Sequence, residues 1–269
     1  MAAAHIRAAA ALGATVSGPT AWGHQGRTLG RRADHPRHGA CWLRLQSAPD
    51  GKEGGRTWTG QEQAAHLFPT VRMPTLHAIH DATTDNHAYR AELTTFVGEP
   101  VLSPNGPVLH HDLDLPDIWF KKIREDLDTV AATATDRVSV RQQWIDRAVP
   151  EFTGHPAPQI SAWTCAHGDL HTGNLTVGAT ILDWEGFGLA PRGWDAALLY
   201  SYALLAPATA ARIRQVLADI LDTHTGRTAL LVVAADLLQA ASRGDHPDLI
   251  TPLRNLVDEI TSGSAFPAQ

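Results

Sequence analysis

The pattern of hydrophobic and polar positions changes once along this chain, close to residue 97. Before that point, short runs of alternating apolar and polar residues predict strands at 40–46 and 88–97. An alanine-rich run at 2–13 and the segment 61–68 are expected to be helical. Beyond residue 107, apolar residues recur at the spacing of amphipathic helices. We expect these helices at 117–132, 138–149, 194–205, 208–224, 229–243 and 249–260.

Strands followed by a helical body predict an α+β protein built from two lobes. The first lobe is expected to span residues 1–97 and the second residues 98–269, with Gly98 and Pro100 in the connector. A chain of 269 residues exceeds a typical single domain, and it can bury a sizeable core in this form.

Composition narrows the range of partners. A formal net charge of -6 argues against a nucleic-acid binder, which usually carries a basic patch. A hydrophobic content of 43% is typical of a soluble globular protein, and no apolar run is long enough to cross a membrane. The two cysteines, Cys41 and Cys165, cannot form a disulfide framework, which favours the reducing cytoplasm. We therefore expect a small-molecule partner, no nucleic acid or membrane, and a monomer or weak dimer.

The most informative segment is His167-Gly-Asp169-Leu-His171-Thr-Gly-Asn174, followed nine residues later by Asp183. Residues 175–177 and 180–182 are expected to pair as a hairpin, because Gly178 can supply the positive φ of a tight turn. Asn174 and Asp183 would then stand at the open ends of that hairpin, close to Asp169 on the preceding loop.

Such a group of oxygen atoms suits Mg²⁺, which prefers carboxylate and amide ligands. Phosphoryl transfer needs an acidic residue that orients the attacking hydroxyl, together with metal ligands that offset the charge of the phosphate. The segment supplies both, so it predicts a phosphotransferase site.

This segment resembles the catalytic and metal-binding loops of the aminoglycoside phosphotransferase and choline kinase family, a branch of the protein-kinase-like superfamily. The resemblance implies a bilobal kinase-like fold, with a small antiparallel sheet in the first lobe and ATP and Mg²⁺ as cofactors. It implies Asp169 as the catalytic base, Asn174 and Asp183 as metal ligands, and His167 as a structural residue of the catalytic loop. Asp195, in Ala190-Pro-Arg-Gly-Trp-Asp-Ala, matches the family's aspartate that supports this loop.

The resemblance extends more weakly into the first lobe. The glycines of Trp22-Gly23-His-Gln-Gly26-Arg-Thr-Leu-Gly30 match the position of a loop that covers the nucleotide. Arg44 stands where the family carries a phosphate-binding lysine, and arginine can also grip phosphate. Lys52 is the alternative if the strand register differs.

Two further features of the first lobe are implied by the resemblance. Glu62, on the helix expected at 61–68, would pair with Arg44. Main-chain groups of Thr94 and Phe96, in the segment before Gly98, would contact adenine.

Several alternatives remain open from the sequence. His171 can face the substrate or metal region, or it can bond to a backbone carbonyl, which we favour. Acidic residues on the late helices can face a polycationic acceptor or, as we favour, form solvated surfaces. They are Asp236, Asp245, Asp248, Asp258 and Glu259. The resemblance leaves aminoglycosides, other antibiotics, amino alcohols and sugars as candidate acceptors.

Two other functions compete with a kinase. The segment 168–174 also resembles elements of dimetal phosphoesterases, with Asp85-Asn-His87 as an upstream Asp-x-His motif. That reading lacks a late cluster of histidines, because only the isolated His224 and His246 follow Asn174. A non-catalytic kinase-like binding module is the second competitor, since Arg44 replaces the expected lysine.

Overall fold

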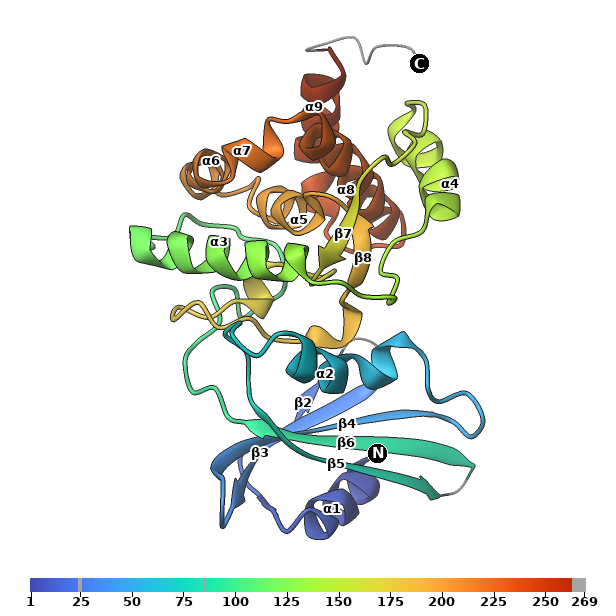
Figure 1. Ribbon diagram of the computed structural model, residues 1–269, viewed down its shortest axis with the longest axis vertical. Helices are drawn as coiled ribbons and strands as arrows, with labels where there is room; N and C mark the ends of the chain where they lie inside the picture. Colours follow the sequence, from blue (N-terminus) through green and yellow to red (C-terminus); the bar gives the residue numbers. More distant parts are fainter. Residues whose placement is uncertain (24–25, 85, 263–269) are drawn as a thin grey trace. The chain divides into compact units, whose positions relative to one another are not determined.

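The computed structural model describes residues 1–23, 26–84 and 86–262. The chain divides into two compact units, Met1–Glu99 and Pro100–Gln269, which we describe separately. The sequence placed the division after residue 97. The first unit contains an antiparallel sheet and the second is mainly helical, as Figure 1 shows, so the predicted α+β class is confirmed.

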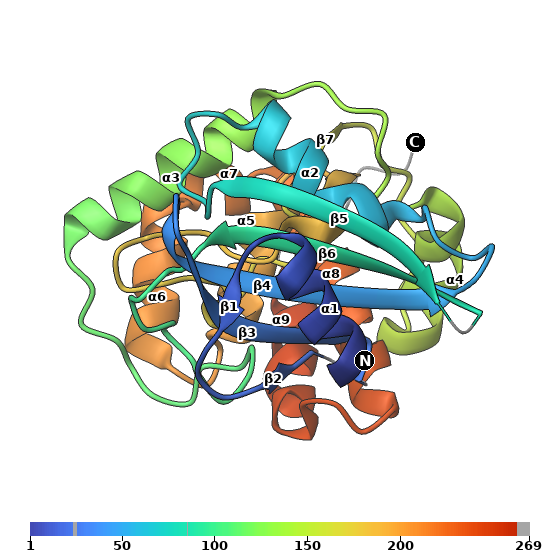
Figure 2. The same cartoon turned by 90° about the horizontal axis from the view of Figure 1, so that it is seen from below.

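The first unit is built on an antiparallel sheet in the order β1-β3-β4-β6-β5, with β2 beside β3. Helices α1 and α2 cover its opposite faces, which Figures 1 and 2 show from the side and from below. The elements are α1 (Ala2–Ala11), β1 (Thr15–Val16), β2 (Ala21–Trp22), β3 (Thr28–His35), β4 (Gly39–Pro49), α2 (Arg56–Leu67), β5 (Leu76–Thr84) and β6 (His87–Thr95).

The alternation of side chains along the strands explains the two faces. One face is apolar and packs against α1, which contributes buried alanines and His5, whose Nε2 lies 3.0 Å from the carbonyl oxygen of Leu43. The strand residues of this core are Ala33, Cys41, Leu43, Leu45, Ala91 and Leu93. The intervening positions of β4 and β6 carry Arg44, Gln46, Arg90 and Glu92 on the face towards α2.

The second unit is organised around α8, a long and largely buried helix that packs against α4, α5 and α9. Strands β7 and β8 form an antiparallel pair that frames the candidate catalytic loop. The elements are α3 (Asp117–Ala132), α4 (Gln142–Thr153), β7 (Trp163–Ala166), η2 (Thr172–Asn174), η3 (Trp184–Gly186), β8 (Gly188–Pro191), α5 (Trp194–Tyr202), α6 (Pro207–Val216), α7 (Ala218–Leu221), α8 (His224–Ser242), η4 (Pro247–Leu249) and α9 (Ile250–Ser262).

The predicted helix at 117–132 is confirmed to the residue by α3, but other boundaries were wrong. Helix α2 begins five residues early, at Arg56, directly after Gly55. Helix α4 begins only at Gln142, because Val138 instead bridges to Leu189 beside β8. The segment expected as one helix at 208–224 divides into α6 and α7 at Leu217, whose φ of -107° and ψ of 19° interrupt the helix.

Within the described residues, none of the helices is both long enough and apolar enough to cross a membrane. Cys41 and Cys165 are both free and buried.

Candidate active site

The loop that follows β7 is held by the carboxylate of Asp195, at the start of α5. Its Oδ2 accepts a hydrogen bond from the His167 amide at 2.7 Å, and its Oδ1 accepts one from the Gly168 amide at 3.0 Å. The indole Nε1 of Trp194 donates to the Gly168 carbonyl at 3.2 Å. Burial raises the pKa of Asp195, although these amides and His167 act in the opposite direction. Asp195 therefore holds the backbone of this loop in place through hydrogen bonds.

Gly168 has a backbone that only glycine adopts at low cost. Its φ is 89°, and a Cβ added there would lie 2.6 Å from Ser139 Oγ and 2.7 Å from the Gly186 carbonyl oxygen. The loop can therefore pack directly against the segment after Asp183.

His167 joins the loop to the hairpin. The ring is fully buried, and its Nδ1 accepts a hydrogen bond from the Asp169 amide at 3.3 Å. Because Nδ1 accepts, Nε2 carries the proton and donates to the Leu182 carbonyl at 2.9 Å. The ring also meets Trp184 edge to face, with centroids 4.8 Å apart. His167 thus connects Leu182, the residue before Asp183, to the backbone of Asp169, the candidate base.

The segment 175–182 doubles back as expected, but its turn differs from the prediction. Leu175 bridges Ile181 in antiparallel fashion, and the Leu182 amide donates to the Asn174 carbonyl at 2.8 Å. Gly178 does not supply the positive φ; Ala179 does, at 68°. Since Asn174 pairs with Leu182, Asn174 and Asp183 both lie at the open end of this hairpin.

The side chains of Asp169 and His171 lie next to each other on the loop. The Asp169 carboxylate is 55% exposed, and its Oδ2 lies 3.6 Å from Nε2 of His171. Desolvation acts to raise the pKa of Asp169, but the hydrogen bonds from His171 and Asn174 and the electrostatic influence of both histidine rings outweigh it, so the pKa is lowered. Asp169 is therefore ionised at neutral pH and can accept a hydrogen bond from a hydroxyl.

The preferred interpretation of His171 was wrong. Its Nδ1 accepts from the Gly173 amide at 3.1 Å instead of bonding to a carbonyl, because the residue caps the short helix η2. Nε2 consequently faces the carboxylate of Asp169 and also lies 3.2 Å from Nδ2 of Asn174.

Asn174 and Asp183 offer oxygen atoms suited to a hard cation. The Nδ2 of Asn174 donates to the Asp169 carbonyl at 3.0 Å, and no donor among the described residues reaches its Oδ1. The exposed carboxylate of Asp183 likewise has no hydrogen-bond or ion-pair partner within the described chain, and its φ of 59° is unusual for a residue other than glycine. An amide oxygen and a carboxylate fit Mg²⁺ when phosphate and water complete the shell. The described residues include no group of three or more His, Cys, Asp or Glu that could bind a metal by protein ligands alone.

In the first unit, the expected pairing of Arg44 with Glu62 was wrong. Arg44 lies directly across from Glu92 on β6, and its Nη1 is 3.3 Å from Glu92 Oε2. Glu62 on α2 instead pairs with Arg90, whose Nη2 is 3.0 Å from Glu62 Oε2. Lys52 lies beyond the end of β4, so Arg44 is the basic residue that the strand itself carries.

The remaining residues predicted in this unit lie at turns and strand ends. The Gly23 amide bonds to the Thr28 carbonyl, and Gly26 has a φ of 68° in the turn between β2 and β3. The loop residues His24 and Gln25 lie outside the described residues. Thr94 is within β6, paired on both sides. The Phe96 amide already donates to the Ala40 carbonyl at 3.0 Å, so it is not available to adenine.

Comparison with known proteins assigns the chain to a family. A model of the Phosphotransferase enzyme family matches residues 57–231, which is more than half of the chain. The chain belongs to this family. A search of curated proteins by sequence finds no match. The family predicted from the sequence and the enzyme class, a small-molecule kinase, are therefore confirmed. The phosphoesterase and binding-module alternatives are set aside. Asp85, which the phosphoesterase alternative required, lies outside the described residues.

Solved structures show that this phosphotransferase has the kinase-like fold predicted from the sequence. The apo form of a thermostable mutant of aminoglycoside phosphotransferase APH(4)-Ia is 13% identical, with a TM-score of 0.63 over 93% of this chain and 96% of that one. Amicoumacin kinase hAmiN is 10% identical, with a TM-score of 0.59 over 95% and 92%. The aminoglycoside-3'-phosphotransferase of type VIII is 16% identical, with a TM-score of 0.52 over 85% and 98%.

Beside the candidate base of this phosphotransferase lies an acidic region that the sequence did not single out as a unit. Tyr202 meets the ring of His171 edge-on at 5.5 Å and that of His246 at 5.8 Å. Burial raises the pKa of Tyr202, and the charges of Asp169, Asp236 and Asp245 raise it further. Two of the late acids thus act on the candidate site. Others have local partners, since Asp248 lies 3.5 Å from His110 and Glu259 lies 2.8 Å from Arg214.

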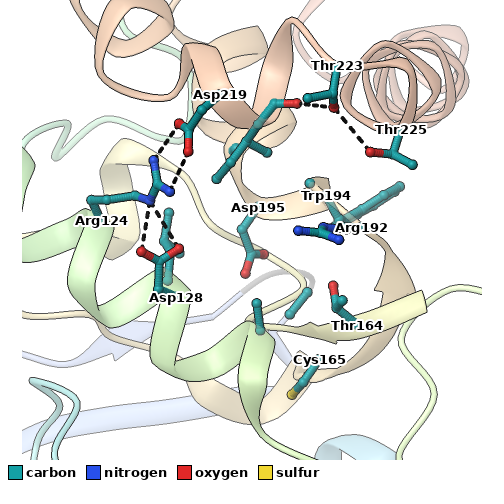
Figure 3. Close-up of a pocket in the computed structure, with 16 residues that line it drawn as sticks. Arg124, Asp128, Thr164, Cys165, Arg192, Trp194, Asp195, Asp219, Thr223 and Thr225 are labelled. Carbon is teal, nitrogen blue, oxygen red and sulfur yellow. Dashed lines mark hydrogen bonds and ion pairs between the residues drawn. The ribbon is translucent and has the colours of Figure 1, made fainter. Parts of the chain in front are cut away.

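A cavity of about 290 Å³ lies behind the catalytic loop, bordered by Asp195 and Trp194 (Figure 3). On its far wall, Arg124 makes a bidentate ion pair with Asp219 at 2.6 and 2.7 Å. Cys165 also lines the cavity, but burial raises its thiol pKa to about 12. The thiol therefore stays protonated and does not act as a nucleophile.

Proposed function

We propose that this phosphotransferase transfers the γ-phosphate of ATP to a hydroxyl group of a small molecule, with Asp169 as the catalytic base. The main support is the hydrogen bonding around the loop. Asp195 accepts from the His167 amide, His167 bonds to the Leu182 carbonyl, and the Leu182 amide bonds to the Asn174 carbonyl. A lowered pKa suits Asp169 to accepting and orienting the acceptor hydroxyl at neutral pH.

Asn174 and Asp183 are proposed as the residues that would hold Mg²⁺, through Oδ1 and a carboxylate oxygen. When bound, this ion supplies positive charge that stabilises the phosphate oxygens during transfer. The bond from Asn174 Nδ2 to the Asp169 carbonyl supports this assignment, because it fixes the amide so that Oδ1 is the free atom. His171 is proposed to orient the Asp169 carboxylate through Nε2.

For the nucleotide we propose that residues 1–97 form the binding lobe and residues 98–269 the catalytic and acceptor-binding lobe. Arg44 would contact the phosphates, its guanidinium held by Glu92. Gly23 and Gly26 would lie in the loop that covers the nucleotide. Carbonyl groups near Thr94 and Phe96 would face adenine, since the Phe96 amide is engaged.

For the acceptor we propose a molecule that carries at least one ammonium group, such as an aminoglycoside, another basic antibiotic or an amino alcohol. The acidic surroundings of Tyr202, whose pKa is raised by the charges of Asp169, Asp236 and Asp245, support a cationic ligand. Solved relatives of the same fold have been captured with AMP-PNP and hygromycin B, and with AMP-PNP, Ca²⁺ and Ami. A role in antibiotic resistance and a cytoplasmic location, where ATP is available and thiols stay reduced, fit this proposal.

The test is ADP release from ATP and Mg²⁺ in the presence of a panel of hydroxylated acceptors, with and without amino groups. We expect turnover with an amine-bearing acceptor and its loss in Asp169→Asn, with Mg·ADP binding retained. Asp183→Asn should lose both turnover and metal-dependent ADP binding. Full turnover in Asp169→Asn would exclude it as the base, and a preference for neutral sugars would overturn the cationic acceptor.

A further inference from the structure

Arg137 is a buried cation that none of the roles above uses. It precedes α4, and only 9% of its surface is exposed. Its Nε donates to the Phe187 carbonyl at 3.0 Å, and its Nη2 donates to the Glu185 carbonyl at 3.0 Å. The guanidinium carbon also lies 4.1 Å from the centroid of the Phe187 ring. One side chain therefore binds the carbonyl groups of both residues that flank Gly186, two and four positions after Asp183.

The backbone around Arg137 strengthens this grip. The Leu189 amide donates to the Arg137 carbonyl at 2.7 Å, and the Ser139 amide donates back to the Leu189 carbonyl at 2.9 Å. At Gly188, an added Cβ would lie 2.9 Å from the Arg137 carbonyl oxygen, so the two strands of chain are in close contact. The segment 137–139 thus fixes the chain from Glu185 to Leu189.

The same segment reaches the loop of the candidate base. The Cβ position of Gly168 is 2.6 Å from Ser139 Oγ and 2.7 Å from the carbonyl oxygen of Gly186. Gly186 is the residue that Arg137 brackets from both sides. Contacts therefore run from Arg137 through Gly186 to Gly168, the neighbour of Asp169.

We propose that Arg137 is a positioning residue that sets the location of Asp183 relative to Asn174, and through it the affinity for the metal–nucleotide complex. This inference rests on the proposed role of Asp183 in holding Mg²⁺. The planar guanidinium is required because it donates in two directions at once while its face covers an aromatic ring. A lysine can replace the charge but not this forked geometry.

The test measures binding instead of turnover. Calorimetry gives the dissociation constant of ADP with and without Mg²⁺ for wild type, Arg137→Lys, Arg137→Met and the matched control Arg141→Met, an exposed arginine four residues further on. We expect both Arg137 variants to weaken Mg·ADP binding by about tenfold, as changes behind metal ligands commonly do. ADP alone should bind them as it binds wild type, and Arg141→Met should match wild type in both.

Phe187→Leu provides a milder variant should the Arg137 variants fail to fold. It leaves the carbonyl contacts and removes the ring beneath the guanidinium, so Mg·ADP binding should weaken by about twofold to threefold. Equal weakening with and without Mg²⁺, or unchanged Mg·ADP binding in every folded variant, would overturn the inference. Asp183→Asn separates this outcome from failure of the proposed site, because wild-type affinity in Asp183→Asn would refute the metal assignment itself.

Discussion

Replacing Asp236 with asparagine should stabilise this enzyme at neutral pH. Asp236 lies on α8 near the candidate base. Burial and the charge of Asp169 raise its pKa from 3.8 to about 6, and Arg243 only partly offsets this. The folded state therefore holds a carboxylate that it would prefer to protonate.

The size and sign of the effect follow from proton linkage. Each unit of pKa shift corresponds to about 1.4 kcal/mol, so a shift of about two units destabilises the ionised folded state by about 3 kcal/mol. Below pH 3.8 the group is protonated in both states and has no such cost. Stability is lost as the pH rises from 3.8 to about 6, and above pH 6 the full penalty applies.

Urea unfolding of wild type and Asp236→Asn at pH 5 and pH 8 measures this penalty. The variant should gain about 3 kcal/mol at pH 8 and roughly half of that at pH 5. Asp114→Asn, which removes an exposed acid before α3, is the matched control and should show little gain at either pH. A gain for Asp236→Asn that is equal at the two pH values would refute the reasoning, because asparagine would then act through packing alone.

Three further outcomes are expected. Asp236→Asn should raise KM for an amine-bearing acceptor by about tenfold and leave KM for ATP unchanged, measured in steady-state assays, since one desolvated charge pair is worth about 1.4 kcal/mol or more. Asp195→Asn should lower the free energy of unfolding by about 2 kcal/mol and reduce kcat. Asp195 now accepts hydrogen bonds from two backbone amides, and the NH₂ group of asparagine would face one of them, donor against donor. Gly168→Ala should lower both the melting temperature and kcat, since the added Cβ pushes against the Gly186 carbonyl and strains the loop that carries Asp169; an unchanged kcat would contradict the close packing seen there.

The sequence predicted the site best where its spacing and the local backbone agree. The two short apolar runs between Asn174 and Asp183 predict a hairpin, and the structure closes it through the bond from the Leu182 amide to the Asn174 carbonyl. The detail of the turn was not predictable, because the choice between Gly178 and Ala179 for the positive φ depends on how Thr176 and Thr180 bond across it. Propensity favours glycine at such a position, but the local hydrogen bonds between Thr176 and Thr180 outweigh that preference.

Long-range partners were beyond the sequence for a different reason. The sequence around Arg137 does not distinguish it from a surface arginine. Only the fold shows that it is buried against Phe187, fifty residues further along the chain. Tyr202 and Asp236 similarly looked like ordinary positions on helices. Their proximity to Asp169 depends on how α5 and α8 pack, which periodicity indicates only as a buried face.

The corrected pairing in the first unit has a consequence for nucleotide binding. Arg44 and Arg90 project from neighbouring strands on the same face of the sheet, and each has a carboxylate partner. Because Glu62 pairs with Arg90, whose Nη1 also donates to the Trp58 carbonyl at 2.9 Å, helix α2 is fastened to β6 by Arg90. Arg44 is instead held by Glu92 within the sheet. The proposed phosphate-binding arginine is therefore paired with a carboxylate of the sheet, whereas the pairing expected from the sequence would have joined it to α2.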